Sequence, residues 1–270
     1  MEKAAESFSW VGSRDNFVDR PHVFSMDHLT VGRFGGNSSA GQYKNEDGCL
    51  VWMNAQTGWE FVLLLDAHNT AESAEKVLKQ VEAHKAALET LLNQPLDSAF
   101  FQSLEKKVLA MFQAEEFRKV CRNVQGETAC LIAVRKGKYI WWFSVGDCLL
   151  YLFHPELAEF GQYQLNQRQF YEWIGQVNTF EGAVPCYSSG TRELRQGDNQ
   201  LFLTTDGLVE CPGEPFAEPK AIRGCFKGVS NEQGVSALLT EIQKNGVRDS
   251  TTVISWEISV HEKAAMASNQ

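Results

Sequence analysis

Two helical patterns in the middle of a strand-rich chain constrain the fold more than any other feature. Apolar residues keep helical spacing from Thr70 to Asn93, and a second apolar stripe follows Asp97, which can cap a helix. The link between them is short, so the two helices should pack antiparallel. Strands are predicted at His28–Val31, Gly48–Met53, Phe61–Leu65, Thr128–Arg135, Tyr139–Val145, Leu149–Phe153, Leu201–Thr204 and Thr251–Val260, and a further helix at Ser236–Lys244. Helices and strands do not alternate, which predicts an α+β fold with antiparallel sheets covered by helices.

The length of 270 residues and a hydrophobic fraction of 43% are sufficient for a full core, which excludes a disordered chain. Residues 1–25 are polar with scattered aromatics, and we interpret them as an N-terminal extension. The predicted domain covers residues 26–262, and residues 263–270 form a polar C-terminal tail. The polar, glutamine-rich stretch from 155 to 200 predicts short strands and loops.

Charge and cysteine content narrow the class of protein. The formal net charge of −9 argues against a broad nucleic-acid surface or a basic membrane-binding helix. The most apolar stretch, Tyr139 to Phe153, is too short to span a bilayer and contains Asp147. Seven scattered cysteines without a CxxC pair indicate reduced thiols, and the N-terminus does not resemble a signal peptide. We therefore expect a cytoplasmic protein with neither a nucleic acid nor a membrane as partner; the sequence predicts no particular oligomeric state.

Three aspartates lie at the ends of predicted strands. Asp66 and Asp206 each end an apolar run, and Asp249 lies just before Thr251–Val260. A carboxylate at the rim of a buried strand is costly unless it is paired or bound to a metal. Glu46 and Asp47 add two acids beside Gly48–Met53. If these groups converge, oxygen-only ligands favour Mg²⁺ or Mn²⁺; taken singly, each aspartate is also typical of a turn or cap.

Six short segments occur in an order that resembles the signature segments of the metal-dependent serine/threonine protein phosphatases of type 2C. They are Asn45-Glu46-Asp47-Gly48, Asp66-Ala67-His68, Gly126-Glu127-Thr128-Ala129, Val145-Gly146-Asp147-Cys148, Thr205-Asp206-Gly207-Leu208 and Asp249-Ser250-Thr251-Thr252. Each is weak alone, but six in order are specific. The resemblance covers roughly residues 26–260 and implies two packed antiparallel β-sheets flanked by antiparallel helices, an αββα sandwich.

The resemblance also implies roles for individual residues. Asp66 would bridge two Mg²⁺ or Mn²⁺ ions, the Ala67 carbonyl would bind one of them, and Asp206 and Asp249 would bind the other. Glu46 and Asp47 would hold metal-bound waters, Asp147 with Asp206 would form a third, weaker metal position, and His68 would be the general acid. The implied reaction is hydrolysis of phosphoserine or phosphothreonine in proteins by a metal-activated water.

Two departures from the family pattern concern turnover more than the fold. The family's usual Asp-Gly-His-Gly-Gly is replaced here by Asp66-Ala67-His68-Asn69-Thr70. The arginine that the family carries shortly before its Glu-Asp pair is also missing, because Gln42-Tyr43-Lys44 occupies that stretch. Lys44 is the nearest cation and is predicted to bind the substrate phosphate. These departures leave open a phosphatase-like regulatory or binding module with weak or no turnover, and the same chemistry on small phosphate esters is a third alternative.

A C-x5-R frame from Cys186 to Arg192 offers a different phosphatase chemistry, in which a thiolate attacks phosphate. A cysteine followed by an arginine at this spacing is common by chance in protein sequences. The residues after Arg192 lead into a turn and not into the helix that would stabilise the thiolate. We therefore interpret this segment as a structural loop.

Overall fold

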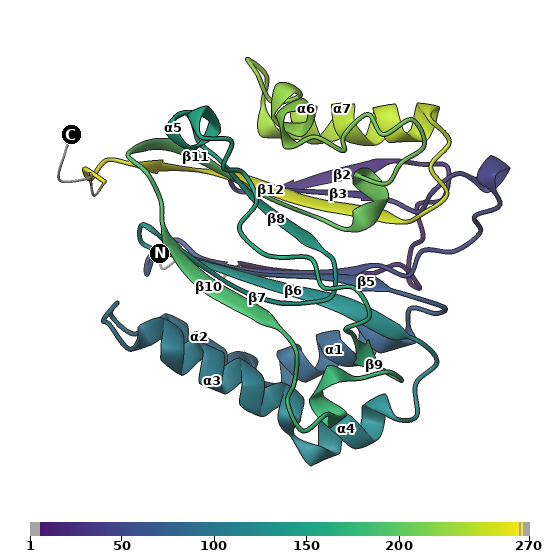
Figure 1. The fold of residues 1–270 in the computed structure, drawn as a ribbon, viewed down its shortest axis with the longest axis horizontal. Helices are drawn as coiled ribbons and strands as arrows, with labels where there is room; N and C mark the ends of the chain where they lie inside the picture. Colours follow the sequence, from purple (N-terminus) through teal and green to yellow (C-terminus); the bar gives the residue numbers. More distant parts are fainter. Residues whose placement is uncertain (1–5, 265, 267–270) are drawn as a thin grey trace.

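The computed structural model describes residues 6–264 and 266, which form four layers: helices, sheet, sheet, helices (Figure 1). The first sheet contains β1 (Glu6–Val11), β4 (Gly48–Asn54), β5 (Trp59–Ala67), β6 (Glu127–Lys136), β7 (Tyr139–Val145) and β10 (Ser188–Glu193) in that order, with β9 (Ile174–Gly175) beside β6. The second contains β2 (His22–Met26), β3 (Leu29–Phe34), β12 (Thr251–Val260), β11 (Gly197–Thr204) and β8 (Leu149–Phe153). Every strand pairing is antiparallel. The predicted αββα sandwich is confirmed.

Helices cover the outer face of each sheet (Figure 1). The first sheet carries α1 (Glu72–Ala83), α2 (Lys85–Leu92), α3 (Phe100–Gln113) and α4 (Glu115–Cys121); the second carries α6 (Pro219–Gly224) and α7 (Asn231–Lys244), and α5 (Pro155–Glu159) follows β8. The contacts of α1 with α4 and of α2 with α3 are those of an antiparallel arrangement. The first predicted helix is divided at His84 into α1 and α2, and the second corresponds to α3. The extended ψ of 129° at Ala114 separates α3 from α4.

Alternation along the strands decides which side chains face the space between the sheets. On β5, Leu63 and Leu65 pack toward the helices, whereas Val62 and Leu64 lie in the core between the sheets. Because side chains alternate along a strand, Asp66 continues the row of Val62 and Leu64. The strand therefore directs this carboxylate to the space between the two sheets, at the end of the sandwich.

The N-terminal segment contributes to both sheets. β1 pairs with β4 over its whole length, from Glu6 opposite Met53 to Val11 opposite Gly48, and β2 pairs with β3. Within residues 6–25, for which the sequence indicates part of an N-terminal extension, β1 and most of β2 therefore belong to the two sheets. Residues 1–5, and 265 and 267–270 of the expected C-terminal tail, lie outside the described residues.

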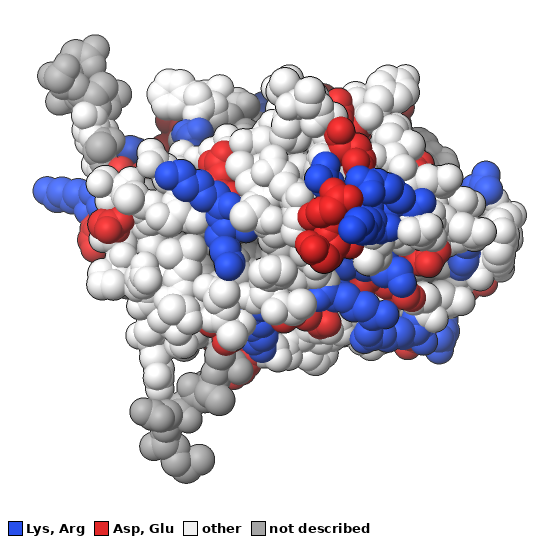
Figure 2. Space-filling view, turned by 90° about the horizontal axis from the view of Figure 1, so that it is seen from below, with Lys and Arg blue, Asp and Glu red and all other residues white. Residues whose placement is uncertain are grey.

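The helical face seen in Figure 2 carries acidic and basic side chains close together. A network on α4 is an example, in which Arg118 and Arg122 pair with Glu115 and Glu181. Among the described helices, none has both the length and the apolar character that a membrane crossing requires.

Candidate metal centre

The first sheet supplies two of the predicted acids. Asp66 is the penultimate residue of β5, with 5% of its surface exposed. Asp147 lies in the Gly146-Asp147-Cys148 connection by which the chain leaves β7 of the first sheet and enters β8 of the second. Gly146 has a φ of +89°, and a Cβ there would lie 2.5 Å from the Cβ of Ala129. Glycine is therefore required for the sharp crossing that places Asp147 beside Asp66.

The second sheet supplies the other acids. Asp206 begins the short 3-10 helix Asp206–Leu208 directly after β11, and Asp249 lies two residues before β12. The Asp249 side chain accepts a hydrogen bond from the Ser250 N–H, at 2.8 Å. Because β11 and β12 are antiparallel neighbours, the end of one and the beginning of the other lie at the same edge of the sheet.

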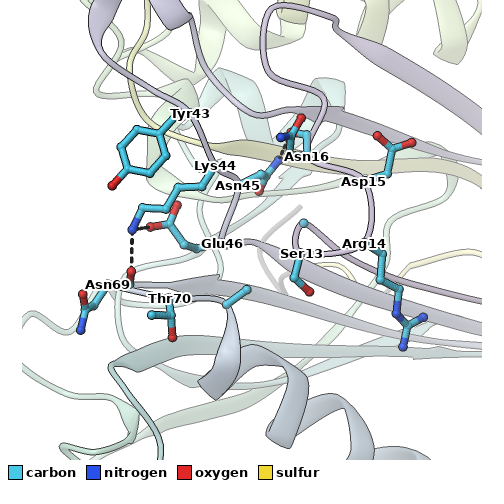
Figure 3. Close-up of a pocket in the computed structure, with 12 residues that line it drawn as sticks. Ser13, Arg14, Asp15, Asn16, Tyr43, Lys44, Asn45, Glu46, Asn69 and Thr70 are labelled. Carbon is cyan, nitrogen blue, oxygen red and sulfur yellow. Dashed lines mark hydrogen bonds and ion pairs between the residues drawn. The ribbon is translucent and has the colours of Figure 1, made fainter.

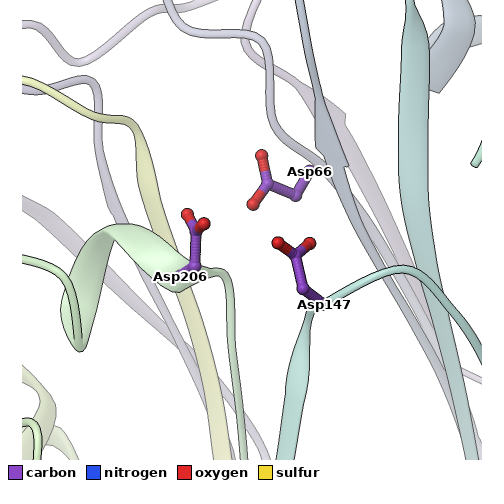
Figure 4. A group of neighbouring side chains, drawn as sticks. All are labelled: Asp66, Asp147 and Asp206. Atoms are coloured by element: carbon purple, nitrogen blue, oxygen red, sulfur yellow. The ribbon is translucent and has the colours of Figure 1, made fainter. Parts of the chain in front are cut away.

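Three of these carboxylates converge between the sheets (Figure 4). One oxygen from each of Asp66, Asp147 and Asp206 lies within 4.8 Å of the others. The resemblance implies that Asp66 and Asp206 share an ion and that Asp147 and Asp206 form a further position, and the structure brings these three side chains into one group.

Asp47 lies behind this group and is fully buried. Its Oδ2 accepts hydrogen bonds from the Thr252 hydroxyl at 2.7 Å and from the Thr205 hydroxyl at 3.3 Å. Thr252 belongs to β12 and Thr205 follows β11 directly. Both lie in the signature segments that carry Asp206 and Asp249, but no role was predicted for either of them from the sequence.

Burial and mutual repulsion raise the pKa values of the clustered acids. Loss of solvation is the main reason that the pKa of Asp66 is raised, and neighbouring carboxylates, Asp47 first among them, raise it further. The same two causes raise the pKa of Asp206 to about 7, with Asp249 as the first contributing charge. A group of carboxylates in this state binds either protons or cations strongly.

The residues present fit divalent cations. Within the described chain, Oδ1 of Asp47, Oδ2 of Asp66 and Oδ1 of Asp147 are buried and have no hydrogen-bond partner. Unpartnered buried polar atoms are rare in folded proteins. All of these atoms are carboxylate oxygens, the ligand type of Mg²⁺ and Mn²⁺.

The metal-free protein should lose stability as the pH rises from about 4 to about 7. The folded-state pKa of Asp206, about 7, lies above the ordinary aspartate value near 3.9, so the folded state binds the proton more tightly than the unfolded state does. The stability that proton binding by Asp206 contributes is fully present below the unfolded-state pKa near 3.9, and it is lost as the pH rises through the folded-state pKa of about 7. We expect the melting temperature in EDTA to fall over this range and the fall to diminish in saturating Mg²⁺. A pH-independent melting temperature in EDTA would contradict the electrostatic account.

The Asp66–Thr70 segment forms its turn without the glycines of the pattern that it resembles. Ala67 is still part of β5 and has an ordinary negative φ, so its carbonyl needs no glycine there. In this segment Asn69 is the residue with a left-handed backbone, at a φ of +72°, and asparagine is one of the few residues that adopt this conformation readily. The His68 N–H donates to the Glu127 carbonyl at 2.8 Å, which continues the contact of β5 with β6 by one residue.

A cavity of about 450 Å³ is lined by two of the predicted acids, Glu46 and Asp249. Its wall includes Ala67, the exposed His68 and Asp249. Two cations also line it, Lys44 and Arg248; Arg248 is exposed and was not identified from sequence.

Lys44 and Glu46 stand between this cavity and a neighbouring one of about 430 Å³ (Figure 3). The Lys44 ammonium pairs with the Glu46 carboxylate at 2.5 Å and donates to the Asn69 carbonyl. Its side chain is 36% exposed. The second cavity is lined by Ser13 and Arg14 from the N-terminal segment, so residues before 25 border this region.

The C-x5-R frame does not form a phosphate-binding loop. Cys186 is exposed, and Ser188–Glu193 is a strand that pairs with β7. The negative charge of Glu172 raises the pKa of the Cys186 thiol, the reverse of what a thiolate nucleophile requires.

We expect Cys186→Ser to leave any phosphatase activity of the protein unchanged within error, because this thiol lies in a loop that leads into β10 and is protonated at neutral pH. The measurement is steady-state hydrolysis of a phosphate ester by wild type and variant, with iodoacetamide treatment of the wild type alongside. A dead variant together with inactivation by iodoacetamide would establish a thiol mechanism.

Comparison with known proteins shows similarity at the level of structure. A bacterial serine phosphatase with an arginine-to-alanine substitution superposes with a TM-score of 0.62 and 17% identity, over 95% of this chain and 98% of that one. Stp1, a serine/threonine phosphatase from Staphylococcus aureus, superposes with a TM-score of 0.59 and 15% identity, over 96% of this chain and 97% of that one. RsbX in complex with magnesium superposes with a TM-score of 0.55 and 14% identity, over 88% of this chain and 100% of that one. Neither the protein-family models nor the curated protein sequences gave a match. At these identities the comparisons establish the fold.

Proposed function

We propose that this chain, whose fold is that of the metal-dependent serine/threonine protein phosphatases of type 2C, hydrolyses phosphoserine and phosphothreonine in proteins with two Mg²⁺ or Mn²⁺ ions. The observation that carries the proposal is the convergence of Asp66, Asp147 and Asp206 within 4.8 Å, with buried oxygens that lack partners. A structural role would not need acids whose pKa values are raised by burial and by mutual repulsion. The adjacent cavity, lined by Ala67 and Asp249, would admit the substrate phosphate.

The residues that would hold the ions come from both sheets. Asp66 would bridge the two ions and the Ala67 carbonyl would bind one, while Asp206 and Asp249 would bind the other; Glu46 and Asp47 would act through water. When bound, the ions neutralise the phosphate and activate a water molecule for attack on phosphorus. The protein's own part is to hold these oxygens at strand ends, where the two sheets fix their positions.

His68 is the group we assign to the leaving oxygen. It follows Ala67 directly and is exposed at the cavity. Burial raises the pKa of Asp249, and the hydrogen bond from Ser250 and the charge of His68 partly offset that rise. The Trp173 ring lies edge-on to it, with ring centroids 6.3 Å apart. A protonated imidazole here would donate its proton to the departing serine or threonine oxygen.

Lys44 is predicted to contact the phosphate. Its ammonium already neutralises Glu46, and a flexible lysine stem can turn from Glu46 toward a phosphate in the same cavity. We expect Lys44→Ala to raise KM about 10- to 100-fold, the loss of one charge-assisted contact of ~1.5–3 kcal/mol, with a smaller change in kcat. Lys44→Arg should retain affinity.

Steady-state kinetics on a phosphopeptide test this assignment, with Lys85→Ala as the control. Lys85 is a lysine of equal exposure, 36%, that pairs with Glu89 on α2. An unchanged KM in Lys44→Ala would shift phosphate binding to the metal ions or to Arg248.

The decisive experiment compares hydrolysis of p-nitrophenyl phosphate and of a phosphopeptide in Mn²⁺, in Mg²⁺ and in EDTA. Hydrolysis with either ion and none in EDTA supports the proposal. Metal binding by calorimetry without hydrolysis of either substrate favours the alternative, a regulatory or binding module, for which the Glu46 pairing of Lys44 is the motivating observation. Hydrolysis of the small ester alone would indicate a non-protein substrate.

A further inference from the structure

A loop between β8 and β9 is anchored on both sides of Asp147. The Asn166 side chain, itself buried, donates to the Cys148 carbonyl at 2.7 Å and accepts from the Leu150 N–H at 2.8 Å. The Gln169 N–H donates to the Gly146 carbonyl at 2.9 Å. These bonds fix the position of the intervening Arg168 relative to the Asp147 connection.

Arg168 directs its guanidinium at two of the three converging acids. Its Nη2 lies 3.6 Å from Oδ2 of Asp147 and 3.6 Å from Oδ2 of Asp206. The same nitrogen donates to Glu210 at 2.6 Å. Only 21% of the Arg168 side chain is exposed, against 55% for Glu210, so the pairing with the aspartates lies on the shielded side of the guanidinium.

A permanent positive charge in this place affects which cations the acids can bind. A divalent ion between Asp147 and Asp206 on this side would lie within a few Å of the guanidinium, and two positive charges at such a distance repel strongly in a partly buried site. The guanidinium cannot lose its proton to relieve the repulsion. Phe170 further confines it, because its ring centroid lies 4.8 Å from the guanidinium carbon.

We propose that Arg168 acts as a built-in cation that takes the place of a third metal ion between Asp147 and Asp206. The protein would then bind two divalent ions and not three, and Arg168 would be a positioning residue that ties the 166–169 loop to the metal centre. This inference rests on the proposed function, since it presumes that Asp66 and Asp206 hold metal ions.

The test counts bound Mn²⁺ per chain by the electron paramagnetic resonance signal of free Mn²⁺, with calorimetry for affinities. Wild type should bind two ions. Arg168→Ala and Arg168→Gln should each gain a third, weaker ion, whereas Arg168→Lys, which retains the charge, should bind two. Arg192→Ala is the control, because Arg192 is a half-buried arginine on β10 that donates to the Gln162 side chain. Its count should equal that of wild type.

The possible outcomes separate this inference from the function it rests on. A wild type that binds three ions, or folded Arg168→Ala and Arg168→Gln variants that still bind two, would overturn the role of Arg168 and leave the phosphatase proposal standing. A wild type that binds no Mn²⁺ would defeat both. Circular dichroism of each variant establishes that the counts refer to folded protein.

Discussion

Replacing Asp66 by asparagine is expected to abolish phosphate-ester hydrolysis and to make the metal-free protein more stable. The Asp66 carboxylate is the member of the converging group that lies on β5, and we assign it to both ions. Asparagine keeps the shape but removes the charge that holds the ions. We expect kcat/KM to fall by at least about 10²–10³-fold, the scale for losing one preorganised electrostatic group.

The stability change has the opposite sign because the buried acids repel one another without metal. Each pKa unit by which folding raises a carboxyl pKa costs about 1.4 kcal/mol at high pH. Removing one acid should raise the melting temperature in EDTA at pH 7.5 by several degrees, at roughly 2–4 °C per kcal/mol. Asp206→Asn should behave in the same way, since the pKa of Asp206 is raised to about 7.

Asp97→Asn provides the matched control. Asp97 is exposed, and its carboxylate accepts from the Ala99 N–H, a bond that asparagine can replace. Activity and melting temperature should match wild type. Wild-type-like hydrolysis in Asp66→Asn would rule out the metal centre. A lower metal-free melting temperature in that variant would show that the Asp66 carboxylate stabilises the fold by more than its repulsion from the other acids destabilises it.

The strands and acids that the sequence predicts most accurately share one property, a sharp change of pattern at the strand end. Tyr139–Val145, Leu149–Phe153 and Thr251–Val260 are strands with the predicted bounds, because turn residues interrupt their apolar runs. Asp66 and Asp206 follow such runs directly. An acid at the edge of a buried strand is visible in the sequence because polarity changes abruptly there.

The features that escaped prediction depend on contacts between distant parts of the chain. β1 is a mixed polar and aromatic segment whose strand structure depends on pairing with β4, about 40 residues later. Arg168 lies in a glutamine-rich stretch without periodicity, and its place beside Asp147 and Asp206 follows only from the anchoring of the loop by Asn166 and Gln169. Such roles carry no local signal in a single sequence.

The 125–127 segment packs against the His68–Thr70 segment, and Gly126 is the residue in it that tolerates least change. Gly126 has a φ of +91°, and a Cβ there would lie 2.0 Å from the carbonyl oxygen of His68. The two segments are also joined by hydrogen bonds from the Thr70 hydroxyl to the Gln125 carbonyl, at 2.6 Å, and from the His68 N–H to the Glu127 carbonyl. An added methyl group must therefore displace His68 and Asn69, which border the cavity.

Gly126→Ala should accordingly lower both stability and activity. The left-handed backbone costs an alanine about 1–2 kcal/mol, and the overlap with a backbone carbonyl adds roughly 1–3 kcal/mol. At about 2–4 °C per kcal/mol, the melting temperature should fall by on the order of 10 °C. The displacement of His68 should reduce kcat as well, because a misplaced proton donor loses much of its effect.

Gly161→Ala separates the cost of the left-handed backbone from the cost of the steric overlap, since Gly161 has a φ of +67° with nothing within 4 Å of an added Cβ. This control should lose about 1–2 kcal/mol of stability for the left-handed backbone and none of its activity. If differential scanning calorimetry finds equal losses for both variants, and hydrolysis is unaffected in both, the packing of Gly126 against His68 does not support the site.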